Sequence, residues 1–155
     1  MTTRNLNRLL SKAIRIASQA HEEQLDKGNS PYILHPMRIM FRLRTDDPEL
    51  NMIAMLHDVM EDTQWTLDDF INEGFTDRVL NALRLLTHNK DHVAYEDYIE
   101  NMCDNLDAVK VKMGDLKDNS DITRLKGVTD KDIERMKKYH KSYLRLDEAK
   151  EKLEG

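Results

Sequence analysis

The sequence predicts an all-α protein, a single-domain helical bundle of about seven to eight helices. Apolar residues recur at helical spacing along most of the chain, and runs of β-branched residues are absent. Only 5 Gly and 3 Pro interrupt the 155 residues. No linker, repeat or low-complexity tract divides the chain, so we expect one domain over residues 1–155.

The first half of the chain divides at its turn-forming residues. An apolar stripe at helical spacing predicts a first helix that ends near Gln24. Residues 26–31 are rich in turn formers and predict a loop. Pro36 and Pro48 each suit the first turn of a helix, where the missing N–H costs nothing. We therefore expect helices at about 36–44 and 48–62.

In the second half, threonines mark where helices begin. Thr66, which has Asp69 three residues on, and Thr76 are typical N-caps. Thr129 before Asp130 opens the last helix in the same way. The expected helices lie at about 67–73, 77–87, 94–103, 107–119 and 130–152.

Composition narrows the class of protein. Hydrophobic residues make up 39% and charged residues 34%, as in a globular rather than a disordered chain. No apolar run approaches the roughly 20 residues that span a bilayer, and the first residues lack a signal-peptide core. With a single cysteine, Cys103, we expect a cytoplasmic protein. The net charge of −5 argues against nucleic-acid binding but permits a small anionic ligand met by local cations.

The segment Leu56–Thr63 carries the densest group of chemically active side chains. It holds a His-Asp doublet, His57 and Asp58, and one helical turn later the acids Glu61 and Asp62. In a continuous helix His57 would lie over Glu61, and Asp58 over Asp62. A divalent cation and a water awaiting deprotonation would explain one imidazole beside three carboxylates. By itself the doublet is a weak signal, because acidic helix faces are commonly just solvated.

Two other segments offer further ligands. His35 lies at a predicted loop-to-helix junction before Pro36, and Asp115 shares a helix face with Lys112 and Asn119. Each residue also has an ordinary explanation that involves no metal. His35 could cap a helix, and Asp115 could belong to a charged, exposed helix face. Combined with His57 and Asp58 they make a set of two imidazoles and two carboxylates. Such a set suits a divalent ion such as Mn²⁺, Fe²⁺ or Zn²⁺, and without thiolates it does not resemble a structural zinc site.

These residues resemble a known family, the HD-domain metal-dependent phosphohydrolases. The order His … His-Asp … Asp carries the general likeness. A sharper likeness, to the alarmone hydrolase domain of the Rel/SpoT proteins and to the stand-alone small alarmone hydrolases, spans about residues 10–125. It rests on the segments Ala20-His21, Gln24, Lys27, Pro31-Tyr32-Ile33, His35-Pro36, Leu56–Thr63, Leu86-Thr87, Tyr95 and Val111–Asp115 through Asn119.

The resemblance implies an activity and a role for each matching residue. The activity is removal of the 3′-pyrophosphate from ppGpp or pppGpp, which yields GDP or GTP and belongs to the stringent response. One Mn²⁺ is implied, with Fe²⁺, Zn²⁺, Co²⁺ or Mg²⁺ as alternatives. The implied metal ligands are His35, His57, Asp58 and Asp115; the water-activating pair is Glu61 and Asp62; the substrate-binding residues are Lys27, Tyr32, Lys112 and Asn119.

Two other functions stay open at this stage. Asp26 stands where the long Rel/SpoT proteins carry a basic residue against the guanine. The substrate could therefore be another nucleotide, such as NADPH with its 2′-phosphate or a nucleoside phosphate. A non-enzymatic, metal-stabilised helical regulatory module is the third hypothesis, against which the spare acid pair Glu61 and Asp62 argues. The oligomeric state is left open.

The remaining candidates are given structural roles. His88, His92 and His140 lie outside the matching motifs. His21 is expected to orient a loop. The run of basic residues at 131–145 is interleaved with acids and tyrosines and is typical of a solvated helix face.

Overall fold

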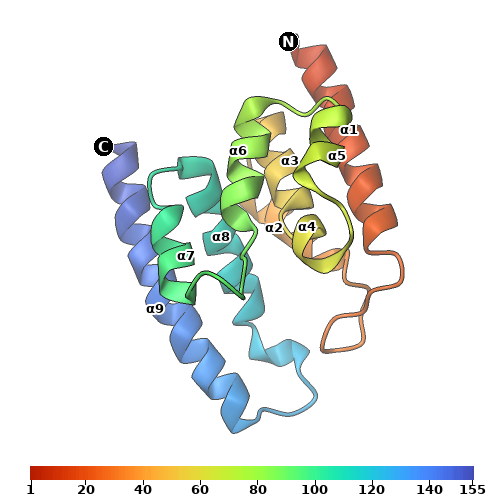
Figure 1. The fold of residues 1–155 in the computed structure, drawn as a ribbon. Coiled ribbons are helices and arrows are strands. Elements are labelled where there is room, and N and C mark those ends of the chain that lie inside the picture. The colour runs from red at the N-terminus through yellow and green to blue at the C-terminus, as the bar shows by residue number, and fades with distance from the viewer.

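The computed structural model describes residues 1–155 as an all-helical bundle, which confirms the predicted fold class (Figure 1). Its only β-type pairing is an isolated bridge between Leu25 and Pro31. The helices are α1 (Thr3–Ala20), α2 (Leu34–Leu43), α3 (Pro48–Leu56), α4 (Val59–Asp62), α5 (Leu67–Asn72), α6 (Asp77–Leu86), α7 (Tyr95–Asn101), α8 (Leu106–Asn119) and α9 (Asp130–Glu154), with a 3₁₀ turn η1 (Ile122–Arg124) before α9.

Helix α8 lies at the centre of the bundle. It packs against α2, α3, α6 and α9, while α1 covers the outer side of α3. In Figure 1 the long α9 runs along one side of the molecule and α1 along the other. Because α8 touches helices from both halves of the chain, a side chain on it can meet residues that are 80 positions away.

The predicted N-caps are confirmed. Thr66 and Asp69 form a reciprocal capping box at α5, in which each side chain accepts from the other residue's backbone N–H. Thr129 forms the same arrangement at α9, and Thr76 accepts from the backbone of Val79 at α6. Each cap satisfies N–H groups that the first turn of a helix leaves without partners. Helix starts with a local side-chain cause were therefore predictable.

The prediction of one helix over 48–62 is wrong. The helical hydrogen-bond pattern is interrupted at His57 and Asp58, although the backbone of both residues stays in the right-handed region, so that α3 ends at Leu56 and α4 begins at Val59. The cause is local: His57 Nδ1 donates to the carbonyl of Ala54 at 2.7 Å, the carbonyl that a continuing helix would offer to the N–H of Asp58.

The first helix is shorter than predicted, because it ends at Ala20 rather than near Gln24. His21 ends it, and its ring Nδ1 lies 2.8 Å from Oε1 of Gln24 in the following turn. This contact agrees with the loop-orienting role expected of His21. The loop beyond it returns to α2, which begins two residues before Pro36.

The core is one continuous cluster of apolar side chains from every α-helix, in which methionines such as Met52, Met55 and Met102 are fully buried. Cys103 is buried and unpaired. None of the helices combines the length and the apolar character that crossing a membrane requires.

Candidate active site

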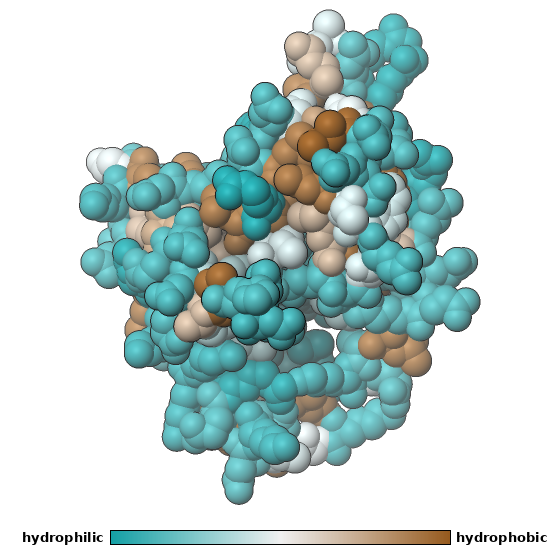
Figure 2. All heavy atoms as spheres, viewed as in Figure 1, coloured by the Kyte–Doolittle hydropathy of each residue, from teal (hydrophilic) through white to brown (hydrophobic).

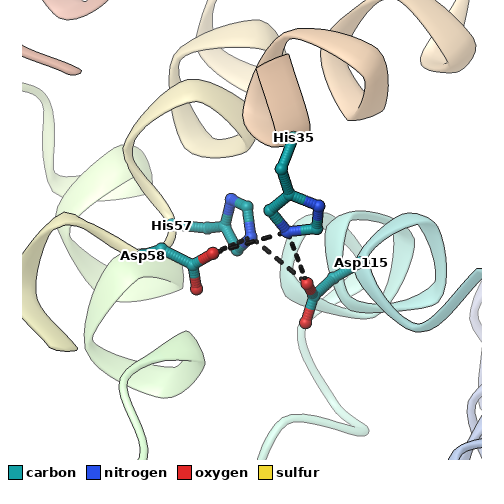
Figure 3. Close-up of side chains that lie close together, drawn as sticks. All are labelled: His35, His57, Asp58 and Asp115. Carbon is teal, nitrogen blue, oxygen red and sulfur yellow. Dashed lines mark hydrogen bonds and ion pairs between the residues drawn. The ribbon is translucent and has the colours of Figure 1, made fainter. Parts of the chain in front are cut away.

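Four side chains from three parts of the chain point toward one another (Figure 3). They are the predicted metal ligands, and one ligand atom from each lies within 4.8 Å of all the others. His35 comes from the first turn of α2 and Asp115 from the middle of α8. His57 and Asp58 come from the break between α3 and α4. The break is what lets two consecutive residues point to the same place.

The imidazole nitrogens and carboxylate oxygens of the cluster lie close enough together to bind one ion. His57 Nε2 lies 3.0 Å from Asp58 Oδ2, and His35 Nε2 lies 2.9 Å from Asp115 Oδ1. The cross contacts, His35 Nε2 to Asp58 Oδ2 and His57 Nε2 to Asp115 Oδ1, are 3.4 and 3.5 Å. Both imidazoles are buried, whereas Asp58 and Asp115 line the pocket in front of the cluster.

Each histidine is oriented through its other nitrogen. His57 Nδ1 donates to the carbonyl of Ala54, so Nε2 is the nitrogen that faces the cluster and offers a lone pair once it is deprotonated. His35 Nδ1 lies 2.6 Å from a carboxylate oxygen of Asp118, which sets the same tautomer. Asp118 is itself buried and is clamped by Arg38, whose Nε and Nη2 bond its two oxygens at 2.8 and 2.9 Å.

Without an ion, the charges of the cluster hold protons on the imidazoles. Burial lowers the pKa of His35, but hydrogen bonds to Asp115, Asp118 and Asp58 outweigh it and raise the pKa to about 11. Burial likewise lowers the pKa of His57, and the charge of Asp58 raises it to about 10. Burial opposes ionisation of Asp58 and Asp115, yet the neighbouring cations keep both carboxyl pKa values below their usual range.

The residues fit a divalent cation. Nε2 of His57 is buried without a hydrogen bond of good geometry, although it is enclosed by carboxylates. Two imidazole nitrogens and two carboxylate oxygens, oriented by outer hydrogen bonds, are a donor set for a borderline-hard divalent metal. The cluster therefore supports a divalent metal site, and the donors alone do not select the ion.

A pocket of about 380 Å³ opens in front of the cluster, and a second of about 360 Å³ adjoins it. The two share Tyr32, Lys90, Asn119 and Tyr139 as lining residues. Figure 2 shows a hollow on this face, between the loop that precedes α2 and the N-terminal part of α9. The first pocket is rich in charged side chains, and the second mixes apolar and charged side chains.

The acid pair lies at this pocket, and each acid has its own partner. Glu61 accepts a hydrogen bond from the backbone N–H of His88 at 2.5 Å, and desolvation raises its pKa. Asp62 accepts from the side-chain amide of Gln24 at 3.1 Å. Gln24 in turn contacts the buried ring of His21 through its amide oxygen. His21 therefore orients the Gln24 side chain, and Gln24 orients Asp62.

The predicted substrate-binding residues all line the two pockets. Lys27 lines the adjoining pocket, Lys112 the first, and Tyr32 and Asn119 both. Lys112 Nζ lies 2.7 Å from a carboxylate oxygen of Asp115. Burial by itself would lower the pKa of Lys112, but the charge of Asp115 and the other neighbours outweigh it, so the pKa is raised. Asn119 donates to Asp115 at 3.0 Å, and the hydroxyl of Tyr32 donates to Asp58 at 2.5 Å.

Sequence reasoning missed several pocket residues. Lys138 and Tyr139 line the first pocket, although they belong to the basic run that was interpreted as a solvated helix face. His88 and Lys90 reach it from the segment between α6 and α7. Asp118 was missed because nothing in a helix pattern separates it from an exposed acid. Its spacing of three residues from Asp115 was the available signal, since such residues share a helix face.

The comparisons with known proteins agree with this geometry at two levels. A solved metazoan SpoT ortholog, described as hydrolysing ppGpp, superposes with a TM-score of 0.74 at 23% sequence identity. The match covers 94% of this chain and 91% of that one, so the chain has the fold of that hydrolase. No model of a protein family matches the sequence.

The sequence itself is similar to proteins named as (p)ppGpp hydrolases and synthases. It is 35% identical over 80 residues to a guanosine-3′,5′-bis(diphosphate) 3′-pyrophosphohydrolase of Aquifex aeolicus, which is 50% of this chain and 11% of that protein. It is 42% identical over 62 residues, 39% of this chain and 9% of the relative, to the bifunctional (p)ppGpp synthase/hydrolase SpoT of Escherichia coli. The chain spans only about a tenth of the length of these two relatives. The likeness to Rel/SpoT proteins expected from the motifs is thereby confirmed.

Proposed function

We propose that this chain is a metal-dependent (p)ppGpp 3′-pyrophosphohydrolase. The observation that carries the proposal is a complete ligand cluster, His35, His57, Asp58 and Asp115, beside two acids that the cluster does not use. A metal kept only for folding needs no such spare acids. The similarity to ppGpp hydrolases in sequence and fold supports the same substrate.

The chain's own residues have distinct tasks in this reaction. A bound divalent ion, for which we propose Mn²⁺, would act as a Lewis acid and lower the pKa of a water. Glu61 and Asp62 take the proton from the attacking water, whose oxygen bonds to the phosphorus attached to O3′. The P–O3′ bond breaks, pyrophosphate leaves, and O3′ gains a proton. Glu61 suits the role of base because its raised pKa brings it nearer to neutrality.

Cations around the pocket would neutralise the pyrophosphate. Lys112 is held charged by Asp115, and Lys90 and Lys138 line the same cavity. Asn119 and Lys27 lie where the nucleoside would extend into the adjoining pocket. A cytoplasmic setting is part of this proposal, because the lone Cys103 needs no oxidising compartment.

Purified protein with Mn²⁺ should release pyrophosphate and GDP from ppGpp. Asp58→Ala should abolish turnover by removing a ligand, and Glu61→Gln should lower kcat while leaving the ion bound. Asp104→Asn, an exposed acid remote from the pocket, is the control. Full activity in Asp58→Ala would overturn the assignment.

The choice of nucleotide is tested by competition among substrates. Asp26 uses one oxygen to accept from the backbone N–H groups of Gly28 and Ser30, so this carboxylate is partly engaged by its own loop. We therefore expect ppGpp to exceed NADPH and common nucleoside phosphates by orders of magnitude in kcat/KM. A preference for NADPH would overturn (p)ppGpp as the substrate, while the proposed metal-dependent hydrolysis would stand.

A further inference from the structure

A third cavity, separate from the two pockets of the active site, lies on the opposite side of α8. It has a volume of about 630 Å³ and is lined by one face of α8 together with the end of α2 and part of α9. Its α8 residues are Met113, Gly114 and Lys117, whereas the active site uses Lys112 and Asp115 of the same helix. At 100° per residue these two sets lie on opposite sides of α8. We call this cavity the rear groove.

The rear groove is positively charged in a chain whose net charge is −5. Arg42, Arg44 and Lys117 line it, against the single carboxylate of Asp121. Neither Arg44 nor Lys117 makes an ion pair or a side-chain hydrogen bond in the structure. Asp121 is engaged elsewhere, because its side chain accepts from the backbone and the hydroxyl of Thr123. The groove therefore offers cations without internal partners.

The backbone at Arg44 is in the left-handed region, with φ 48° and ψ 48°. It ends α2, a position where glycine or asparagine is usual because a Cβ is disfavoured there. A long cationic side chain is therefore unusual at this position. Unfavourable backbone geometry of this kind gathers at ligand sites.

The rest of the groove's lining is largely apolar. It consists of Ile39, Leu43, Met113, Gly114 and the aromatic side chain of Tyr143. A bare inorganic anion would leave this surface unused. A ligand with a flat, largely apolar body and a phosphate tail would contact these side chains and reach the three cations.

One of the three cations also reaches the active site. Arg42 Nη1 donates to Asp118 Oδ1 at 3.0 Å, and the other oxygen of Asp118 accepts from His35 Nδ1 at 2.6 Å. The Arg42 side chain is 48% exposed, so it can turn to an anion in the groove. Arg38 would keep Asp118 in place when Arg42 leaves, because it bonds both carboxylate oxygens.

We propose that the rear groove binds a nucleoside polyphosphate, and that the bound phosphates draw Arg42 away from Asp118. The groove is a regulatory site in this proposal: its occupancy removes one of the two arginines that neutralise Asp118, the carboxylate that His35 contacts. Two sites joined by an element with two arrangements, here the Arg42 side chain, are what coupling between ligands requires.

Binding can be mapped residue by residue in an ¹⁵N-labelled sample saturated with Mg²⁺, which is diamagnetic. Titration with Mg·ADP should shift the backbone amides of Arg44, Gly114, Lys117 and Tyr143 with one dissociation constant. Inorganic pyrophosphate should bind there at least tenfold more weakly. Equal binding of pyrophosphate would overturn the assignment of a nucleoside ligand.

The double variant Arg44→Glu/Lys117→Glu should weaken the groove shifts at least tenfold. Arg4→Glu/Arg84→Glu is the matched control, with the same change of net charge at exposed arginines that have no ion pairs. Arg44→Gly removes the cation while favouring the left-handed backbone, so it keeps the test valid if the double variant folds poorly. Shifts confined to the pocket around Lys27 and Lys90, or unaltered in Arg44→Gly, would overturn the groove site.

The link to the active site has its own readout. The side-chain nitrogen signals of His35 should move with the same dissociation constant as the groove amides. In Arg42→Gln the groove amides should still shift, while the His35 signals should no longer follow. A His35 signal that responds equally in that variant would overturn the coupling. Binding is followed here without hydrolysis, so the outcome is independent of the proposed activity.

Discussion

The imidazole of His57 shows how much a single hydrogen bond can decide. By bonding the carbonyl of Ala54 it ends α3, turns Asp58 into the cluster and selects its own tautomer. Periodicity cannot reveal this, because a polar pair fits a helix as well as it fits a break. The sequence motif therefore predicted which residues meet, while the geometry that lets them meet became visible only in the structure.

Asp118 is expected to act on the metal site through His35. Asp118→Asn removes the negative charge that supports the imidazole, so we expect metal affinity to fall by about tenfold or more, as for other outer partners of ligating histidines. Calorimetric titration with Mn²⁺ measures the change. Asp121→Asn, an acid three residues on that does not touch His35, should bind Mn²⁺ as the unaltered protein does. Equal affinity in Asp118→Asn would refute the role.

Gln24 is expected to position Asp62. Gln24→Leu removes the amide from which Asp62 accepts a hydrogen bond, and we expect kcat for ppGpp to fall by about tenfold, less than the roughly 10²–10⁴-fold that a whole acid–base group contributes. KM and Mn²⁺ affinity should be little changed, because Gln24 touches neither the cluster nor the lysines. A loss confined to KM would instead make Gln24 a substrate contact.

At the scale of helices, α2 and α8 approach closely at one point. A Cβ on Gly114 would lie 3.0 Å from Cγ2 of the buried Ile39, closer than such atoms normally pack. The glycine therefore allows His35 on α2 to reach Asp115 on α8. The close approach of α2 thus explains a glycine in the interior of α8.

Gly114→Val should lower the free energy of unfolding by about 1–3 kcal/mol, because overpacking must push α2 away from α8. Gly114→Ala should change it by less than about 1 kcal/mol, since the better helix propensity of alanine offsets the milder clash. Urea denaturation of the metal-free proteins measures both. A valine variant as stable as the alanine variant would show that the helices separate freely here.

Helix positions were predictable to the extent that their causes are local. The caps Thr66, Thr76 and Thr129 bond within their own turns, and those helices begin where expected. The α3–α4 break and the early end of α1 depend on histidine contacts that a pattern of apolar residues does not record. Likewise, Lys138 looked like surface because its role depends on α9 passing the pocket.

For the whole molecule, the cluster predicts opposite pH dependences with and without metal. The pKa values of His35 and His57 are raised to about 11 and about 10 in the folded protein, from an ordinary 6.5. Their contribution to the stability of the metal-free protein is thus complete below pH 6.5 and is lost as pH rises toward those values. Metal binding needs both imidazoles deprotonated, so it tightens with rising pH.

The difference in melting temperature between Mn²⁺-loaded and chelator-treated protein should therefore widen from pH 6.5 to pH 8.5. Thermal unfolding followed by circular dichroism measures it. In His57→Ala, which lacks one of the ligands, the difference should be small at every pH. A constant difference in the unaltered protein would contradict the assigned proton release.

The order in which the ligands occur along the chain has a consequence for how the protein is made. His35, His57 and Asp58 leave the ribosome well before Asp115, and Asp115 reaches them only once α8 has packed against α2 and α3. A nascent chain that ends before α8 offers an incomplete donor set to passing ions. The ion can be captured in full only after these distant segments have closed on one another, so metal loading follows folding and marks the chains that have completed it.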